Sequence, residues 1–172
     1  MHLSSGDIQA LLSLLPPFPG LRVLEVGCGC GILSFPLAAH LKHHEGRLDL
    51  YEFPDADGAH GALDQSVAPS NMRLHLLSHR TVPHITEREY EVAFLTNAYH
   101  TFPDPKTLLS EIYHGLENSG IFGLITSQND TDIQNATADM DREGFVAINP
   151  IELDEGSVVI TAKKMHHWGR GM

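Results

Sequence analysis

Short apolar blocks alternate with amphipathic stretches along nearly the whole chain, and this alternation predicts strands connected by helices. The apolar blocks predict strands at residues 21–26, 48–51, 72–77, 90–96, 121–126, 144–148 and 157–162. Apolar residues at helical spacing predict helices at residues 8–15, 32–41, 55–65, 106–116 and 130–142. Strands that alternate with helices in this way are typical of an α/β protein with a mostly parallel sheet.

One stretch, residues 21–31, joins the first predicted strand to a helix and reads Leu-Arg-Val-Leu-Glu-Val-Gly-Cys-Gly-Cys-Gly. Its glycines, Gly27, Gly29 and Gly31, permit positive φ angles and remove side chains that would collide with a ligand. A strand, a glycine loop and a helix therefore let the backbone approach a nucleotide-like molecule closely. A tight glycine turn without a ligand is the plainer alternative, and turn chemistry alone does not explain why an acid, Glu25, stands in register with the glycines.

The spacing within this loop separates several kinds of nucleotide site. A dinucleotide fingerprint would place its third glycine at residue 32, which is an isoleucine, and this argues against a nicotinamide-dependent oxidoreductase. A P-loop is excluded because no Gly-Lys-Ser/Thr follows the glycines. A second acid, Glu52, ends the next predicted strand 21 residues after Gly31. A carboxylate at this distance can accept hydrogen bonds from both ribose hydroxyls of a nucleoside, and an exposed strand-end acid is the alternative.

The pattern Glu-x-Gly-x-Gly-x-Gly, residues 25–31, resembles motif I of the class I S-adenosylmethionine-dependent methyltransferases. The resemblance implies that Glu25 orders the loop and helps to hold the methionine part of the cofactor. Residues 90–126 are similar to the small-molecule branch that includes the quinone-ring methyltransferases, where the pattern is Asn-x-x-His-His-x-x-Asp-Pro, an amphipathic helix, Leu-x-x-Gly-Gly and an apolar strand. This chain departs from that pattern at Thr101, which stands for the second histidine, and at Ser119, which stands for a glycine.

The family resemblance covers nearly the whole chain and implies a Rossmann-like, doubly wound, three-layer α/β/α fold. It implies a seven-stranded sheet of order 3-2-1-4-5-7-6. The last two strands form a closing antiparallel hairpin, and the last strand runs antiparallel in the sheet. We expect a single methyltransferase domain over residues 1–164 and a C-terminal tail over residues 165–172. Many members carry an acid after the third strand that binds the adenine amino group, whereas this chain has Ser78 and His79 there.

The ligands of an open parallel sheet lie at the carboxyl ends of its strands. We therefore expect one crevice that holds S-adenosylmethionine, with the cofactor-binding candidates Glu25, Gly27, Cys28, Gly29, Gly31, Glu52, Phe53, Ser78, His79 and Asn97. In this reading Asn97 bonds the methionine moiety, and Tyr99 and His100 face the methyl group and the acceptor. His100 is the candidate general base, because a neutral imidazole accepts a proton near pH 7, and a packing or cofactor-orienting role is its alternative. Tyr99 either takes part in catalysis or only shapes the pocket.

The amino-acid composition limits the kinds of partner that we expect the protein to bind. The 172 residues carry 22 acids against 11 Lys and Arg, a formal net charge of −11, which argues against nonspecific binding to nucleic acid or to an anionic membrane.

The two cysteines, Cys28 and Cys30, are too close for an ordinary disulfide and have no second pair to complete a zinc site, so we read them as small side chains in a crowded turn. The 12 histidines lack metal-site spacing, and we expect no metal. The N-terminus lacks the features of a signal peptide and no apolar run could span a bilayer, so we expect a cytoplasmic protein.

The sequence thus favours a methyltransferase that transfers a methyl group from S-adenosylmethionine to a small molecule. A catalytically inactive, methyltransferase-like binding or scaffold protein is the main alternative. A nucleic-acid methyltransferase is disfavoured, because no Asn/Asp-Pro-Pro-Tyr/Phe motif follows the fourth strand, and a protein substrate stays open. The short segment before residue 21 suggests that a second subunit or another protein covers an open site over Tyr99 and His100.

Overall fold

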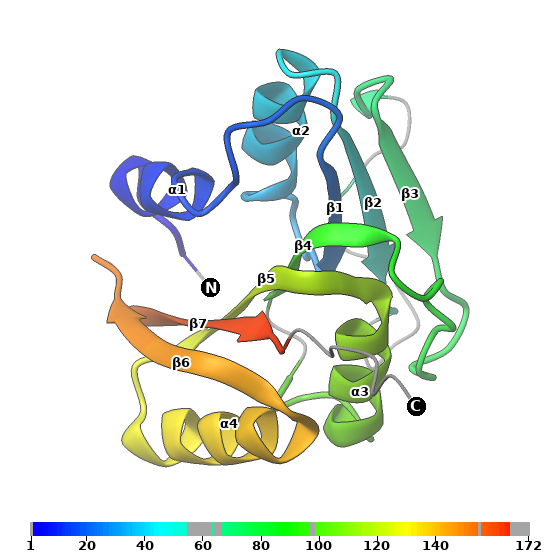
Figure 1. Ribbon diagram of the computed structural model, residues 1–172. Helices are drawn as coiled ribbons and strands as arrows, with labels where there is room; N and C mark the ends of the chain where they lie inside the picture. The colour runs from blue at the N-terminus through cyan, green and yellow to red at the C-terminus, as the bar shows by residue number, and fades with distance from the viewer. Residues whose placement is uncertain (1, 55–62, 64–66, 97–98, 155, 166–172) are drawn as a thin grey trace, which may run out of the picture.

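The computed structural model describes residues 2–54, 63, 67–96, 99–154 and 156–165 (Figure 1). The described helices are α1 (Ser5–Leu12), α2 (Ser34–Lys42), α3 (Pro105–Gly115) and α4 (Asp130–Glu143). The described strands are β1 (Arg22–Val26), β2 (Arg47–Glu52), β3 (Met72–Leu76), β4 (Tyr90–Thr96), β5 (Leu116–Ser127), β6 (Phe145–Glu152) and β7 (Ser157–Lys164). The helix expected at residues 55–65 falls outside the described residues, apart from Leu63.

The strands form one seven-stranded sheet of order β3-β2-β1-β4-β5-β7-β6. Strands β3, β2, β1, β4 and β5 pair in parallel, whereas β7 is antiparallel to both β5 and β6. The expected Rossmann-like fold and strand order are therefore confirmed. Because β1 lies between β2 and β4 and all three strands run in the same direction, the loops that follow them open at one edge of the sheet.

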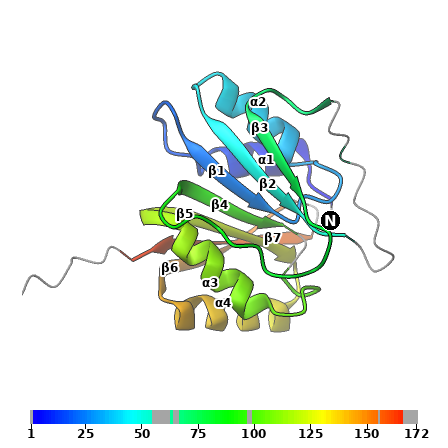
Figure 2. The ribbon, with the colours of Figure 1, turned by 90° about the vertical axis from the view of Figure 1, so that its right-hand side faces the viewer.

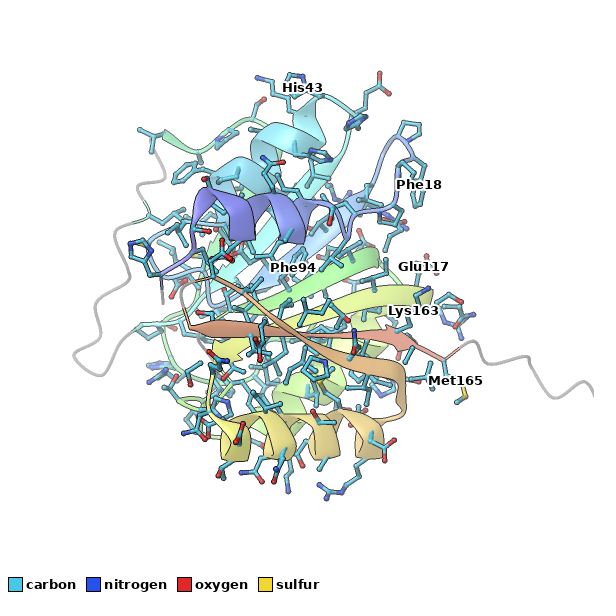
Figure 3. All side chains as sticks on the ribbon, turned by 90° about the vertical axis from the view of Figure 1, so that its left-hand side faces the viewer. Phe18, His43, Phe94, Glu117, Lys163 and Met165 are labelled. Carbon is cyan, nitrogen blue, oxygen red and sulfur yellow. The ribbon has the colours of Figure 1, made fainter. Side chains whose placement is uncertain are left out.

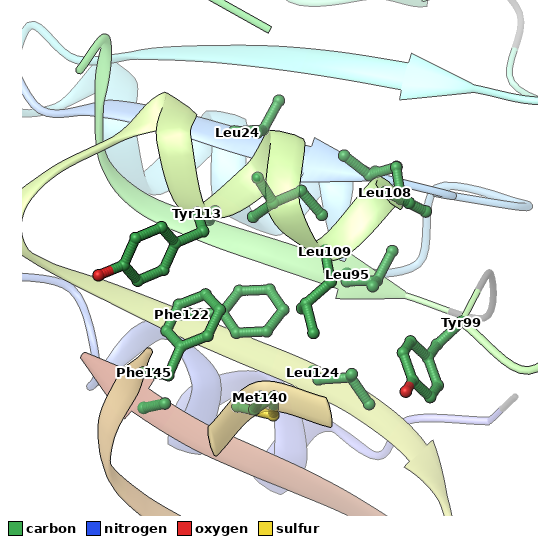
Figure 4. Packing of buried hydrophobic residues seen from close by; sticks show 14 of the residues in the cluster. Leu24, Leu95, Tyr99, Leu108, Leu109, Tyr113, Phe122, Leu124, Met140 and Phe145 are labelled. Atoms are coloured by element: carbon green, nitrogen blue, oxygen red, sulfur yellow. The ribbon is translucent and has the colours of Figure 1, made fainter. Parts of the chain in front are cut away.

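Helices cover both faces of the sheet, α1 and α2 on one side and α3 and α4 on the other (Figures 1 and 2). Alternate residues of the central strands supply the two cores, since successive side chains of a strand point to opposite faces. In β4, Ala93 and Leu95 belong to the cluster under α3 and α4, whereas Val92 and Phe94 belong to the cluster under α1 and α2. Figure 3 shows Phe94 beneath α1, and Figure 4 shows the other cluster, where side chains of α3 pack towards Phe122 and Phe145.

The element boundaries follow local signals in most places. Ser4 and Asp7 form a capping box at the start of α1, and Asp104 caps α3 with Pro105 in its first turn. The largest difference from expectation is β5, which begins at Leu116 rather than at residue 121, and α3 ends at Gly115. The pairing of β4 with β5 shifts its register between Tyr90 and Val92, which accommodates this early start. Ser119, in the part of β5 opposite this shift, adopts a φ of 64°. No helix among the described residues is both long enough and apolar enough to cross a membrane.

Candidate functional site

The carboxyl ends of β1, β2 and β4 bring the predicted site residues to one edge of the sheet. Val26 pairs with Tyr51 of β2 and with Leu95 of β4, and the Gly27 N–H donates to the Tyr51 carbonyl at 2.8 Å. The loop after β3 reaches the same edge, because the Leu77 N–H donates to the Glu52 carbonyl at 2.9 Å. The glycine loop, the end of β2 and the loop after β3 are thus neighbours, as the sequence predicted.

The glycine loop adopts the backbone conformation for which glycine is suited. Gly27, Gly29 and Gly31 have φ angles of 78°, 58° and 78°, which L side chains rarely adopt. Packing adds a second requirement at Gly31, since a Cβ atom there would lie 2.6 Å from the Leu63 Cδ1 atom and 3.0 Å from the Phe35 ring. Leu63 and Phe35 therefore pack against the end of the loop.

Glu52 is bonded to the glycine loop through one carboxylate oxygen. Its Oε2 atom accepts a hydrogen bond from the Gly29 N–H at 2.8 Å and another from the Cys28 thiol, whose Sγ atom lies at 2.6 Å. Glu52 is buried, and Cys28 is 2% exposed. Burial strongly raises the pKa of the Cys28 thiol, and the Glu52 carboxylate raises it further, so the thiol keeps its proton and acts as a donor.

Glu25 is completely buried at the end of β1. Burial raises the pKa of its carboxyl to about 7, the Glu52 charge adds to the rise, and the hydroxyls of Ser34 and Thr96 act in the opposite direction. The Thr96 hydroxyl lies 3.5 Å from Glu25 Oε1, whereas Oε2 accepts no hydrogen bond from the described residues. A buried acceptor of this kind costs free energy unless a further group binds it.

Thr96 is a site residue that the sequence analysis missed. Its hydroxyl donates to the Gly27 carbonyl at 2.6 Å, and it also lies 3.3 Å from the Val26 carbonyl. It thereby ties the end of β4 to the start of the glycine loop. The sequence did contain a signal for Thr96: it is a polar residue at the carboxyl end of a mostly apolar strand, where the ligands of a parallel sheet bind.

The remaining cofactor candidates differ in exposure. Ser78 and His79 are exposed in the loop after β3. Phe53 is buried, and its ring lies 4.7 Å, centroid to centroid, from the ring of Phe102 in the segment between β4 and α3. Asn97 lies outside the described residues.

The two catalytic candidates point towards β5 and α4. The Tyr99 hydroxyl donates to Asp139 Oδ2 at 2.6 Å, and burial, together with this bond, raises the pKa of the phenol. His100 lies with its Nε2 atom 2.9 Å from the Thr126 hydroxyl at the end of β5 and with its Nδ1 atom 3.9 Å from Asp132 of α4. Figure 4 shows Tyr99 at the end of the core under α3.

Both residues line a pocket between α4 and the start of α3. Its volume is about 440 Å³, and its walls are Tyr99, His100, Pro105, Lys106, Asn135, Ala138, Asp139 and Arg142. Asp139 organises one wall, because it binds the Tyr99 hydroxyl and also pairs with Arg142 at 2.6 Å. A larger apolar groove of about 650 Å³ lies farther along α4, against β6, and does not include these candidates.

Comparison with known proteins supports the fold. No protein-family model and no curated protein matches the chain. Among solved structures, it is similar to a SAM-dependent methyltransferase from Aquifex aeolicus, with a TM-score of 0.70 and 13% identity over 92% of this chain and 90% of that one. The [4+2]-cyclase SpnF gives a TM-score of 0.75 and 11% identity over 93% of this chain and 81% of that one. The CurJ carbon methyltransferase gives a TM-score of 0.68 and 19% identity over 92% of this chain, which spans only 52% of that protein.

Proposed function

We propose that the protein binds S-adenosylmethionine at the carboxyl edge of its sheet and transfers the methyl group to a small molecule. One observation carries the proposal: Glu52, at the end of β2, is bonded to a loop of three glycines that have positive φ angles, next to a buried Glu25 whose Oε2 atom accepts no hydrogen bond from any described residue. A nucleoside with a cationic amino-acid arm matches these groups, since it has hydroxyls for one carboxylate and an ammonium for the other.

Each residue then has a role set by its position. Glu52 would bind the ribose hydroxyls and Glu25 would hold the methionine end, while Ser78, His79 and Phe53 would border the adenine. The absence of Cβ atoms at Gly27 and Gly29 lets the backbone come close to the ligand. A bound sulfonium cofactor supplies its own electrophilic methyl group, so the protein has to align the acceptor and exclude water.

The 440 Å³ pocket beside His100 is the proposed acceptor site, and its size supports a small molecule as the substrate. His100 would remove a proton from an acceptor hydroxyl or amine, and the Thr126 hydroxyl at 2.9 Å would fix its ring. Tyr99 would shape the wall, because its hydroxyl is bonded to Asp139.

A binding protein without turnover is the second candidate. Two observations favour it: the Phe53 ring packs against Phe102, and the Tyr99 hydroxyl is bonded to Asp139, so both groups already have partners within the protein. The similarity to a [4+2]-cyclase also illustrates that this fold carries activities other than methyl transfer.

Isothermal titration with S-adenosylmethionine and S-adenosylhomocysteine tests cofactor binding. We expect micromolar binding that Gly29→Arg abolishes. Gly20→Arg is the matched control, because Gly20 also has a positive φ, of 74°, and its Cβ position is open. Loss of binding in Gly29→Arg alone supports the site, whereas a folded wild type that binds neither ligand overturns the proposal. Formation of S-adenosylhomocysteine in an acceptor screen then separates an enzyme from a binding protein.

The proposal extends to a cover for the acceptor pocket, supplied by a second copy or by another protein. The exposure of His100 supports this extension. Sedimentation of the purified protein tests it, since a monomer with full activity on a small acceptor would contradict it.

A further inference from the structure

We propose that Cys28 is a positioning residue for ribose recognition: its thiol holds the Glu52 carboxylate in the orientation that receives the ribose hydroxyls. The inference rests on the proposed cofactor site. It gives a specific role to a side chain that the sequence analysis named among the cofactor-binding candidates and read as a small side chain in a crowded turn. Cys28 acts through Glu52.

The geometry places two donors on one oxygen. Glu52 Oε2 accepts a hydrogen bond from the Gly29 N–H at 2.8 Å and another from the Cys28 thiol at 2.6 Å. Two consecutive residues of the glycine loop therefore donate to the same atom. No described residue donates a hydrogen bond to the other oxygen, Oε1, which would therefore be available to the ribose. A single donor would leave the carboxylate free to rotate about its terminal bond, because that torsion is broad. Two donors from a rigid loop restrict this rotation.

The environment of Cys28 makes a neutral donor necessary. Its side chain is 2% exposed and belongs to the apolar cluster that contains Leu33 and Leu37. A cationic donor would be costly to bury there, and an apolar side chain would leave the loop side of Glu52 Oε2 with the Gly29 amide alone. The thiol keeps its proton beside the Glu52 carboxylate, so it donates over the whole physiological pH range.

A carboxylate that is already oriented binds a diol more selectively than a mobile one, because less side-chain freedom is lost on binding. Removal of the thiol should therefore weaken recognition of the ribose hydroxyls and leave other parts of the cofactor site unchanged. This loss of ribose selectivity distinguishes positioning from packing, since a packing role would change stability and not selectivity.

The test compares dissociation constants for S-adenosylhomocysteine and for its 2′-deoxy and 3′-deoxy analogues. We expect the wild type to prefer the intact ribose by about tenfold to hundredfold, as for loss of a hydrogen bond to a charged group. Cys28→Ala should reduce this ratio by about threefold to tenfold. Cys28→Ser keeps a donor and should stay within about twofold of the wild type. Cys30→Ser is the matched control, because Cys30 is an exposed thiol in the same loop, and it should leave the ratio unchanged.

Selectivity equal to the wild type in a folded Cys28→Ala variant overturns the inference and leaves the cofactor site intact. Equal loss of selectivity in Cys28→Ala and Cys28→Ser also overturns it, since the donor would then be irrelevant. If Cys28→Ala prevents folding, Cys28→Thr and Cys28→Val are compared instead. These two variants have the same shape, and only threonine keeps a donor, so Cys28→Val alone should lose ribose selectivity. Failure of the wild type to bind any of the three ligands is a separate result, which overturns the proposed function itself.

Discussion

At the scale of single residues, burial of Glu25 costs stability, and the proposed function gives the same residue a role in binding. It is fully buried, its pKa is about 7, and it faces the Glu52 charge from β2 and the hydroxyls of Ser34 from α2 and Thr96 from β4. The folded-state pKa lies above the ordinary value of 4.5, so the stability that protonation provides is complete at low pH and is lost as the pH rises through about 7. Ionised Glu25 therefore destabilises the fold at pH 8.

We expect Glu25→Gln to be more stable than the wild type at pH 8 by roughly 1–3 kcal/mol, and the gain to shrink towards pH 5. The same variant should bind S-adenosylhomocysteine at least about tenfold more weakly, because the ammonium loses its carboxylate. Urea unfolding at pH 5, 6.5 and 8, with the exposed Glu152→Gln as control, measures the first effect. A stability difference that does not vary with pH would contradict the argument.

His100 and Tyr99 are adjacent, and their contacts predict different consequences of substitution. His100→Gln should lower kcat by about 10²–10⁴ for an acceptor that must lose a proton, whereas Tyr99→Phe should change kcat by less than about threefold. Tyr99→Phe should instead reduce stability by about 1–3 kcal/mol, since it removes a 2.6 Å bond to Asp139. Steady-state kinetics over pH 6–9 and urea unfolding separate the two. Equal losses of kcat would show that the phenol takes part in the reaction.

At the scale of elements, the sequence predicted the bounds of a strand or helix where neighbouring residues carry the signal. Residues 90–96 were predicted as a strand and form β4 with these bounds, because the apolar run 92–95 lies between the polar residues Glu91 and Thr96. The start of β5 was not predicted, since Leu116 joins the sheet by pairing with Tyr90, 26 residues earlier in the chain. The bond between Tyr99 and Asp139 was missed for the same reason, because no local pattern links residues 40 positions apart.

The junction between α3 and β5 depends on a lysine from β7. The Lys164 ammonium donates to the Leu116 carbonyl at 2.7 Å and to the His114 carbonyl at 3.5 Å, and it lies 5.0 Å from the centroid of the Tyr113 ring. The Leu116 carbonyl thereby gains a donor, and the His114 carbonyl, which also accepts from the Arg88 N–H at 3.0 Å, gains a second one.

We expect Lys164→Met to reduce stability by about 1–3 kcal/mol, because the Leu116 carbonyl loses the lysine donor at 2.7 Å. Lys163→Met is the matched control, since Lys163 is exposed on the same strand (Figure 3), and it should change stability by less than about 0.5 kcal/mol. Urea unfolding monitored by far-UV circular dichroism compares the two. Similar losses would indicate that charge alone matters, and not the contact with α3.

At the scale of the whole molecule, charge is distributed differently at the two edges of the sheet. At the amino edge, Arg22 pairs with Glu91 at 2.5 Å, and Arg47 pairs with Glu89. At the carboxyl edge, Glu25 and Glu52 lie close enough for the charge of one to raise the pKa of the other. Together with the formal charge of −11, this arrangement makes the proposed cofactor site favourable to a cation.

The two forms of the proposed cofactor differ by one charge, and this difference tests the electrostatic field of the whole protein. S-adenosylmethionine carries a sulfonium and is net positive, whereas S-adenosylhomocysteine is net neutral. Salt shortens the Debye length from about 30 Å at 0.01 M to about 8 Å at 0.15 M, so it screens distant acids and leaves short contacts almost unchanged. Raising NaCl from 10 to 300 mM should therefore weaken the sulfonium form about twofold to fivefold more than the neutral form. Titration calorimetry at several salt concentrations measures both, with 5′-methylthioadenosine as an uncharged control. Equal salt dependence of the two forms would mean that local contacts alone recognise the sulfonium, and that the acidic surface serves another purpose.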